Sequence, residues 1–205
     1  MTTSSQVTRS KITPIRGRSS RKDRNAAIRG RYPRLVTLSS HRTVELRLMG
    51  DADRDDVLAF AHSLPPDSLL YLQANITEPE TVDAWLTNTH QGRTITVLAY
   101  EGKQLIGEGS LHHSATTWTR HIGEIRLLIA PSVQHQGLGR ILASEIDAIA
   151  KLLKLQMLSA RMTLDQVAAQ AVFRRLGFQR EAVLWDYVIA ADGKTRNLLV
   201  ATKRL

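Results

Sequence analysis

The 205-residue sequence contains no cysteine, and this absence excludes disulfide bonds, thiolate nucleophiles and cysteine-based metal sites. No apolar run approaches the roughly 18 residues that a membrane-spanning helix requires, and no internal repeat is evident. A hydrophobic content of 42% is sufficient for one globular domain with a proper core. We therefore expect a soluble, cytoplasmic protein without membrane contact.

Acidic residues are nearly absent from the first 35 positions. This segment holds ten Lys and Arg residues against Asp23 alone, which accounts for the whole net charge of +9. It is rich in Ser, Thr and Gly and poor in large apolar groups, so we expect a disordered basic tail over residues 1–35 and a folded domain over residues 36–205. Three interpretations of the tail stay open: non-specific attraction to polyanions, an arm that binds RNA, ribosome or an acidic protein surface, and a transit peptide.

Two familiar nucleotide-binding loops are also missing. No P-loop occurs, and the dinucleotide fingerprint fails because Leu142 stands where its third glycine is required. Instead, Gly137 and Gly139 lie between an apolar strand and a long amphipathic helix. Glycine lets the backbone approach a ligand closely, and a helix N-terminus offers unpaired N–H groups. The loop therefore suits a diphosphate, although an ordinary strand-to-helix turn has the same pattern.

Hydrophobic periodicity predicts an α+β domain. The expected strands are, approximately, residues 44–49, 94–100, 104–114, 121–129, 155–163, 180–190 and 195–205. The expected helices are, approximately, residues 53–64, 79–89, 138–153 and 165–176. The glycine loop then lies at the turn of a β-α-β unit.

Three blocks in this order carry a family resemblance: residues 124–131, Gln134-x-x-Gly137-x-Gly139 with Arg140 after it, and residues 173–178. Together they resemble the GCN5-related N-acetyltransferase (GNAT) superfamily of bacterial type, over roughly residues 44 to 205. The resemblance implies the GNAT fold, a mixed and mostly antiparallel sheet of about seven strands flanked by about four helices. It also implies acetyl-CoA as co-substrate.

The same resemblance assigns residues to the cofactor. Backbone amides of the loop are expected to contact the CoA diphosphate, the strand before it is expected to pair with the pantetheine arm, and one glutamine is expected to touch the cofactor. These residues are Leu127, Leu128, Ile129, His135, Gln136, Gly137, Leu138, Gly139, Arg140 and Gln166. An amide of Leu128 or Ile129 would then face the thioester oxygen.

Glu124 is the predicted general base. An amine such as that of lysine has a pKa near 10.4, so its neutral form at pH 7 is handicapped by roughly 4.6 kcal/mol, and a base helps to remove the proton. Glu124 lies thirteen residues before Gly137, where bacterial GNAT protein-lysine acetyltransferases place their catalytic glutamate. The competing interpretation is a strand glutamate that faces solvent or pairs with Arg126 on the same face.

One departure from the family concerns the general acid. Many members have a tyrosine there, whereas this chain has Phe173, which has no proton to give. Transfer without an acid, protonation by Tyr187 or water, and a weakened or non-catalytic relative all stay open.

The predicted function is acetyl-CoA-dependent transfer of an acetyl group to a primary amine by direct attack. The acceptor stays open among a protein lysine, a protein N-terminus and a small-molecule amine, with residues 68–72 and the region of Trp85 expected to set specificity. The alternative is a catalytically weakened CoA-binding module whose tail recruits RNA or an acidic protein. Adjacent His112 and His113 point to opposite faces of a strand, so we expect no metal site. The oligomeric state is not predicted.

Overall fold

The computed structural model describes residues 20–205 except 70–73, 115–117 and 191, and it is built on one eight-stranded sheet. The strand order is β1-β2-β3-β4-β5-β6-β8-β7, and only the β5–β6 pair is parallel. The strands are β1 Arg34–Thr37, β2 Thr43–Leu48, β3 Thr94–Glu101, β4 Gln104–His113, β5 Ile122–Ile129, β6 Met157–Thr163, β7 Gln179–Ile189 and β8 Thr195–Arg204. The predicted mixed, mostly antiparallel sheet is confirmed, with β1 as a strand that the sequence did not indicate.

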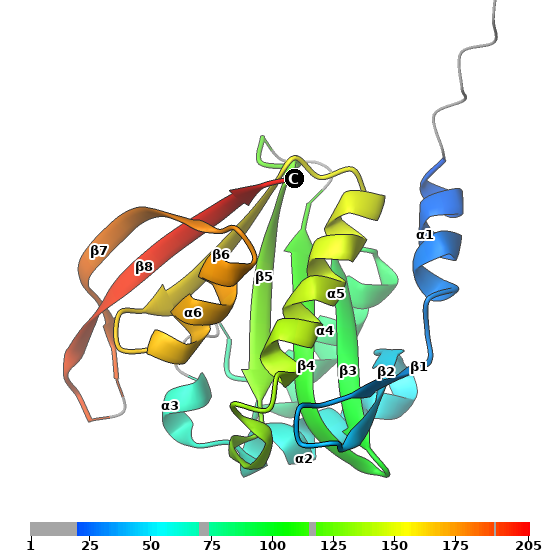
Figure 1. Cartoon of the computed structure of the whole chain (residues 1–205), viewed down its shortest axis with the longest axis horizontal. Coiled ribbons are helices and arrows are strands. Elements are labelled where there is room, and N and C mark those ends of the chain that lie inside the picture. The colour runs from blue at the N-terminus through cyan, green and yellow to red at the C-terminus, as the bar shows by residue number, and fades with distance from the viewer. Residues whose placement is uncertain (1–19, 70–73, 115–117, 191) are drawn as a thin grey trace, which may run out of the picture.

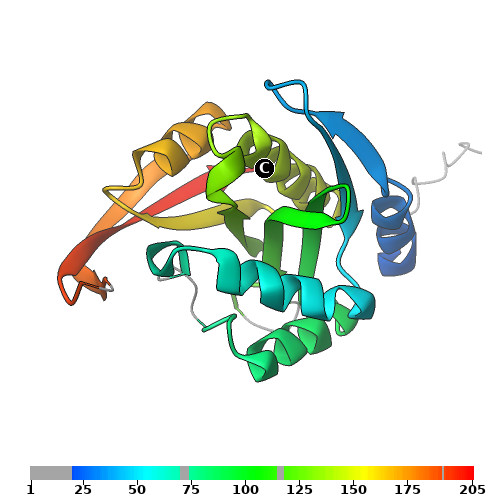
Figure 2. The same cartoon turned by 90° about the horizontal axis from the view of Figure 1, so that it is seen from below.

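Helices cover both faces of the sheet (Figures 1 and 2). They are α1 Arg21–Arg29, α2 Arg54–Ser63, α3 Pro66–Leu69, α4 Pro79–His90, α5 Leu138–Leu152 and α6 Val167–Arg175, with 3₁₀ turns at Asp51–Asp53 and Pro131–Val133. α2 and α4 lie on one face, and α5 and α6 lie on the other. Among the described residues, no helix is both long and apolar enough to cross a membrane.

The position of α5 is fixed by close packing on the centre of the sheet. Its apolar face is fully buried, and two glycines of β4 let it approach. A Cβ at Gly109 would lie only 3.3 Å from side-chain carbons of Leu142 and Ile146. Burying a leucine or isoleucine contributes about 1.5–3 kcal/mol, so this contact holds the helix firmly. The N-terminus of α5 is therefore a rigid feature of the molecule.

β5 and β6 separate halfway along their length. Their pairing runs from Ile122↔Met157 to Ile125↔Ala160 and stops there. β5 stays paired with β4 as far as Ile129, while β6 stays paired with β8 through Thr163. Because each strand follows its other neighbour, a gap opens between them, which Figure 1 shows as two diverging arrows. The backbone of β5 beyond Ile125 therefore has one unpaired edge.

Residues 20–35, expected to be disordered, are folded in the structure. α1 begins with a capping box, in which the Ser20 hydroxyl accepts from the Asp23 amide at 3.1 Å and the Asp23 carboxylate accepts from the Ser20 amide at 2.8 Å. Ile28 of α1 is buried, and the helix packs against α5. The expectation of a tail to residue 35 is therefore wrong for residues 20–35, and residues 1–19 lie outside the described residues.

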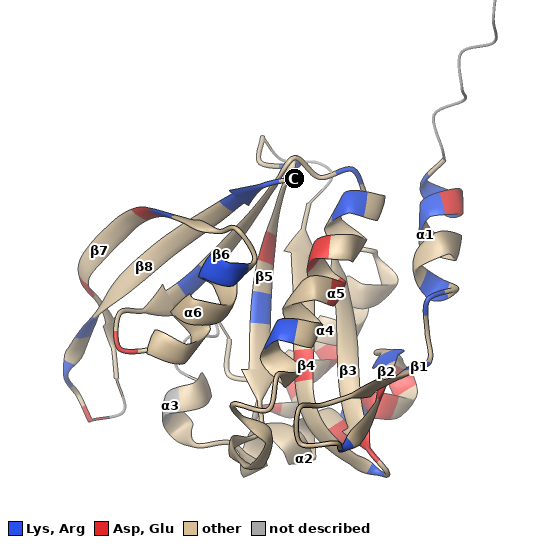
Figure 3. Ribbon diagram, in the orientation of Figure 1, with Lys and Arg blue, Asp and Glu red and all other residues tan. Residues whose placement is uncertain are grey.

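A buried carboxylate of α5 explains why this basic segment is ordered. Glu145 is 4% exposed, and its Oε2 accepts from Arg31 Nη2 at 2.9 Å and from the Tyr32 hydroxyl at 2.7 Å. Its Oε1 accepts from Arg34 Nη2 at 2.7 Å. Figure 3 places the basic positions of α1 and the segment after it at the edge of the fold next to α5. A buried charge needs such partners, so the arginines serve the fold.

Candidate active site

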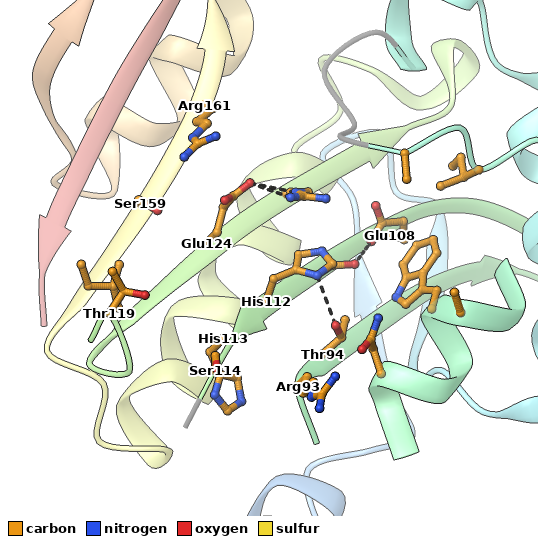
Figure 4. Close-up of a pocket in the computed structure, with 18 of the residues that line it drawn as sticks. Arg93, Thr94, Glu108, His112, His113, Ser114, Thr119, Glu124, Ser159 and Arg161 are labelled. Carbon is orange, nitrogen blue, oxygen red and sulfur yellow. Dashed lines mark hydrogen bonds and ion pairs between the residues drawn. The ribbon is translucent and has the colours of Figure 1, made fainter. Parts of the chain in front are cut away.

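A cavity of about 750 Å³ opens on the face of the sheet that carries α2 and α4 (Figure 4). Side chains alternate along a strand, and the lining residues of β4 and β5 are even-numbered except for His113 at the end of β4. The polar floor comprises Thr94, Glu108, Ser110, His112, Glu124, Arg126, Ser159 and Arg161. α4 contributes Trp85 and Asn88 to one wall. Four neighbouring strands thus bring polar groups to one place.

The predicted base Glu124 lies in this cavity, in an ion pair. Its Oε1 accepts from Nε and from Nη2 of Arg126, both at 2.9 Å, and its side chain is 21% exposed. Across the ladder, Glu124 faces His112 of β4. The pairing with Arg126, which the sequence offered as the competing interpretation, therefore occurs, and Glu124 also lines the cavity.

A second carboxylate, Glu108 of β4, was not singled out from the sequence. It is 2% exposed, and the Ser110 hydroxyl donates to its Oε2 at 2.5 Å. Burial raises the pKa of Glu108 to about 7, against the lowering effect of the Ser110 hydrogen bond and of the Arg126 charge. Its place between Gly107 and Gly109 is the only sequence signal for it. Which face it occupies depends on strand register.

The donor to Glu108 is the end of a longer hydrogen-bond chain. Trp85 Nε1 donates to Thr96 Oγ1 at 3.0 Å, and Thr96 Oγ1 lies 3.1 Å from Ser110 Oγ. The indole N–H only donates, so the hydroxyl of Thr96 is free to donate to Ser110, and that of Ser110 donates to Glu108. All three donors then point toward the carboxylate.

The two adjacent histidines remain uncharged at neutral pH. His112 Nδ1 lies 3.2 Å from Thr94 Oγ1, and burial, together with the Arg126 charge, lowers the pKa of His112 to about 4. Burial also lowers the pKa of His113. Within the described part of the chain, no three His, Cys, Asp or Glu side chains gather as a metal site.

The predicted phosphate loop is a left-handed turn that opens α5. His135 has a φ of 60°, and Gly137, the N-cap residue, has a φ of 89° with open space around its Cα. The N–H groups of the first helical turn, which includes Leu138, Gly139 and Arg140, have no partner within the helix. The Arg140 side chain is exposed, whereas that of Leu138 is buried and leaves only its amide.

Gln136 anchors this loop to the β1–β2 connection. Its Oε1 accepts from the Ser40 hydroxyl at 2.6 Å, its Nε2 donates to the Ser132 carbonyl at 3.0 Å, and its own carbonyl accepts from the Ser39 amide at 3.1 Å. The Gln136 side chain is therefore engaged within the protein, and its backbone amide is the group that the resemblance assigns to the diphosphate.

The strand ladder distinguishes Leu128 from Ile129. Ala130 N–H donates to the Ile106 carbonyl at 2.9 Å, so by the alternation of an antiparallel ladder Leu128 also directs its N–H to β4. Leu127 and Ile129 direct theirs the other way, toward the gap where β6 has separated. Of the two amides predicted to face a thioester oxygen, that of Ile129 has the suitable direction.

The remaining predicted residues lie beyond the gap. Gln166 precedes α6, and its Oε1 accepts from the Thr163 amide at 3.1 Å at the end of β6. Phe173 is buried, with its ring 5.0 Å from that of Phe178 in an edge-to-face contact. Tyr187 is 62% exposed on the edge strand β7 and does not line the cavity. Of the predicted specificity segment, residues 70–72 lie outside the described residues.

Residues 59–178 match the family model of the acetyltransferase (GNAT) family. No curated protein matches the sequence. Solved structures do. A GNAT-family acetyltransferase from Streptococcus pneumoniae is 20% identical, with a TM-score of 0.69 over 79% of this chain and 99% of its own. A ribosomal-protein-alanine N-acetyltransferase from Brucella melitensis is 23% identical, with a TM-score of 0.69 over 78% of this chain and 99% of its own. An acetyltransferase from Salmonella typhimurium, solved with its cofactor acetyl-CoA, is 17% identical, with a TM-score of 0.68 over 79% of this chain and 94% of its own. At these identities the likeness concerns the fold.

Proposed function

Because the chain belongs to the acetyltransferase (GNAT) family, we propose that it transfers the acetyl group of acetyl-CoA to a primary amine that enters the cavity. The observation that carries this proposal is the free edge of β5. It runs from the glycine loop at one end to the polar cavity at the other. We expect a nucleotide thioester held along that edge to have its diphosphate at the N-terminus of α5 and its acyl group at the polar cavity.

The chain offers suitable groups for the diphosphate. Gly137 adopts a left-handed φ that favours glycine, and nothing lies within 4 Å of the position where a Cβ would stand. The amides of residues 137–140 and the exposed Arg140 side chain provide donors and positive charge at the N-terminus of α5. We expect His135 and Gln136 to contact the diphosphate through their backbone amides only, because the Gln136 side chain is hydrogen-bonded within the protein.

The unpaired edge of β5 is suited to an extended ligand. Leu127 and Ile129 direct their backbone groups into the gap, where a pantetheine arm completes the ladder in place of β6. The Ile129 amide then donates to the thioester oxygen, where negative charge develops during attack, and Leu128 supplies the β4 pairing that keeps the strand in place. Gln166 stands on the far side of the gap, next to β6.

The amine has to lose a proton before it attacks. At neutral pH this deprotonation costs a lysine-like amine roughly 4.6 kcal/mol, so a carboxylate at the attack site has a clear use. The resemblance indicates Glu124, and its place in the cavity supports this assignment. The amine nitrogen forms a bond to the acetyl carbon, the carbon–sulfur bond breaks, and CoA leaves as a thiolate.

The acceptor is an amine, and experiment has to decide whether that amine belongs to a protein or to a small molecule. Ribosomal-protein-alanine acetyltransferases occur among the structural neighbours, which makes a peptide N-terminus a reasonable first probe. Phe173 favours the alternative of a weakened CoA-binding module, since the usual acid is missing. Turnover decides between the two.

Isothermal titration with acetyl-CoA, with adenosine diphosphate as the control ligand, tests the cofactor first. We expect micromolar affinity well above that control, and no binding would refute the proposal. Glu124→Gln is expected to lower kcat/KM for the amine by a large factor while acetyl-CoA affinity stays the same. Unchanged kcat/KM would remove Glu124 from the mechanism.

A further inference from the structure

Glu108 is a buried carboxylate for which the proposed function has no use. Its side chain is 2% exposed, yet among the described residues it forms no ion pair, and Ser110 is its hydrogen-bond partner. Burying a carboxylate without a counter-ion costs stability, and a serine hydroxyl offsets only part of that cost. An apolar side chain here would serve the core better, so the buried carboxylate indicates a functional role.

Glu108 lies closer than Glu124 to the free amides of β5. In the β4–β5 ladder Glu108 pairs directly with Leu128, the neighbour of Ile129, whereas Glu124 pairs with His112. Glu124 precedes Ile129 by five positions on the same strand, which is roughly 16 Å along an extended chain. Provided that the thioester oxygen meets the Ile129 amide, as proposed above, Glu108 is the carboxylate beside it.

The surroundings of Glu108 restrict what can change its charge. Arg126 faces it from β5, and the uncharged His112 lies on its own strand. α4 lines the cavity with Thr81, Ala84, Trp85 and Asn88, none of which is charged, and α2 contributes no residue to the lining. The opposing residue on β5 is the apolar Leu128. Burial therefore dominates, and the hydrogen-bond chain from Trp85 through Thr96 and Ser110 opposes it.

We propose that Glu108 takes the proton from the acceptor's ammonium ion beside the thioester. This inference rests on the proposed N-acetyl transfer and divides between two carboxylates the work that the resemblance gives to Glu124 alone. Glu124 offers its carboxylate to the ammonium ion as it enters the cavity, while Arg126 keeps that carboxylate in place. Glu108 accepts one proton and leaves a neutral amine, which attacks the acetyl carbon. The second nitrogen proton passes to the departing thiolate, and Glu108 returns its proton to water.

The chemistry favours Glu108 for this step. A carboxylate with a pKa of about 7 accepts a proton from an ammonium ion roughly 300-fold more favourably than one at 4.5, and it is still half ionised at neutral pH. The chain of donors keeps that pKa from rising further. Trp85, Thr96 and Ser110 are thus positioning residues that hold Glu108 ionisable in a buried place.

The test is a set of pH–rate profiles for kcat with acetyl-CoA and a tetrapeptide that carries a free N-terminus and one lysine. We expect wild-type kcat to rise about tenfold per pH unit below a midpoint near 7 and then to level. Glu108→Gln is expected to lower kcat at pH 7 about 100- to 10,000-fold and to replace the midpoint near 7 by a rise that follows the ionisation of the acceptor amine at higher pH. Glu124→Gln is expected to raise KM for the peptide and to keep the midpoint near 7.

Graded variants of the hydrogen-bond chain give a readout that a merely structural role would not. Ser110→Ala removes the donor that lowers the pKa of Glu108, so the midpoint should move to higher pH, and Thr96→Val should move it less in the same direction. Thr94→Val removes another buried hydroxyl from β3 that contacts His112 instead, and its midpoint should equal that of the wild type.

Hydroxylamine is the second acceptor probe, because it is a weakly basic amine that is mostly neutral at pH 7. Glu108→Gln should lose much less activity with hydroxylamine than with the peptide. Several outcomes would overturn the assignment: a midpoint near 7 that survives in Glu108→Gln, a midpoint near 7 that disappears in Glu124→Gln, or equal losses with both probes. Binding of acetyl-CoA by the wild type with no turnover of either probe would also overturn it and favour the non-catalytic module. Absence of acetyl-CoA binding would instead refute the proposed function itself.

Discussion

Replacing Glu108 by Gln is predicted to stabilise the protein at alkaline pH. The folded-state pKa of Glu108 is raised to about 7 from an ordinary value of 4.5, chiefly because the side chain is buried. Glutamine keeps the size of the side chain and the oxygen that accepts from Ser110, but it has no charge to bury. The substitution therefore removes the cost of ionisation and little else.

The sign and size of the effect follow from linkage. A group whose pKa is raised on folding favours the folded state when protonated, and this favourable contribution is lost as the pH rises through the folded pKa. With values of 4.5 and about 7, the loss amounts to about 3 kcal/mol at pH 8 but under about 1 kcal/mol at pH 5. Glu108→Gln should thus exceed the wild type by about 2 kcal/mol more at pH 8 than at pH 5.

Urea unfolding followed by circular dichroism at both pH values measures this difference. Glu80→Gln, at an exposed position of α4, controls for the loss of a carboxylate as such. A stability difference between Glu108→Gln and wild type that is the same at pH 5 and pH 8 would refute the reasoning, because it would mean that Glu108 is not buried as a titrating group. A gain in stability combined with a loss of kcat would identify a residue kept for function.

Three further predictions concern the loop, the N-terminal anchor and the basic segment. Gly137→Ala should cost about 1 kcal/mol of stability and weaken acetyl-CoA binding in titration. Gly193→Ala, at another glycine with a left-handed φ, should cost stability alone. Equal acetyl-CoA affinities of the two variants would contradict the role of the loop. Glu145→Gln should lower the free energy of unfolding in urea by about 2 kcal/mol, since Arg31 and Arg34 lose their charged partner, and an unchanged value would show that the ion pairs contribute nothing. Deleting residues 1–19, which hold four of the basic residues, should weaken salt-sensitive RNA binding and leave peptide acetylation intact. Retained RNA affinity in the deletion variant would mean that RNA binds elsewhere on the protein.

Most of the folded domain was predictable because its signals are local. The hairpin of β3 and β4 turns at Gly102, and α5 begins directly after Gly137, both with positive φ. By contrast, α1 and β1 were missed because the charged segment around them finds its partner, Glu145, more than 110 residues later. Composition reports how much apolar surface a segment can bury, but it cannot report a distant buried carboxylate.

The site was predictable in part for the same reason. Glu124 was singled out by its position relative to the glycine loop, and in the structure it lines the cavity. Glu108 was missed because its burial depends on strand register and on which face of the sheet it occupies. The preference for Ile129 over Leu128 likewise depends on which amides bond to β4, and only the assembled ladder settles this.

The absence of a tyrosine at position 173 is only a weak argument against catalysis. Phe173 is buried against Phe178 and has no hydroxyl, so no proton reaches the thiolate from there. A thiol has a pKa near 8.5, so expelling it as a thiolate at pH 7 costs about 2 kcal/mol, whereas a lysine-like amine must be deprotonated at a cost of about 4.6 kcal/mol. The reaction therefore depends more on a base than on an acid. The thiolate takes the second proton of the attacking nitrogen, as described above, so the step needs no side-chain acid.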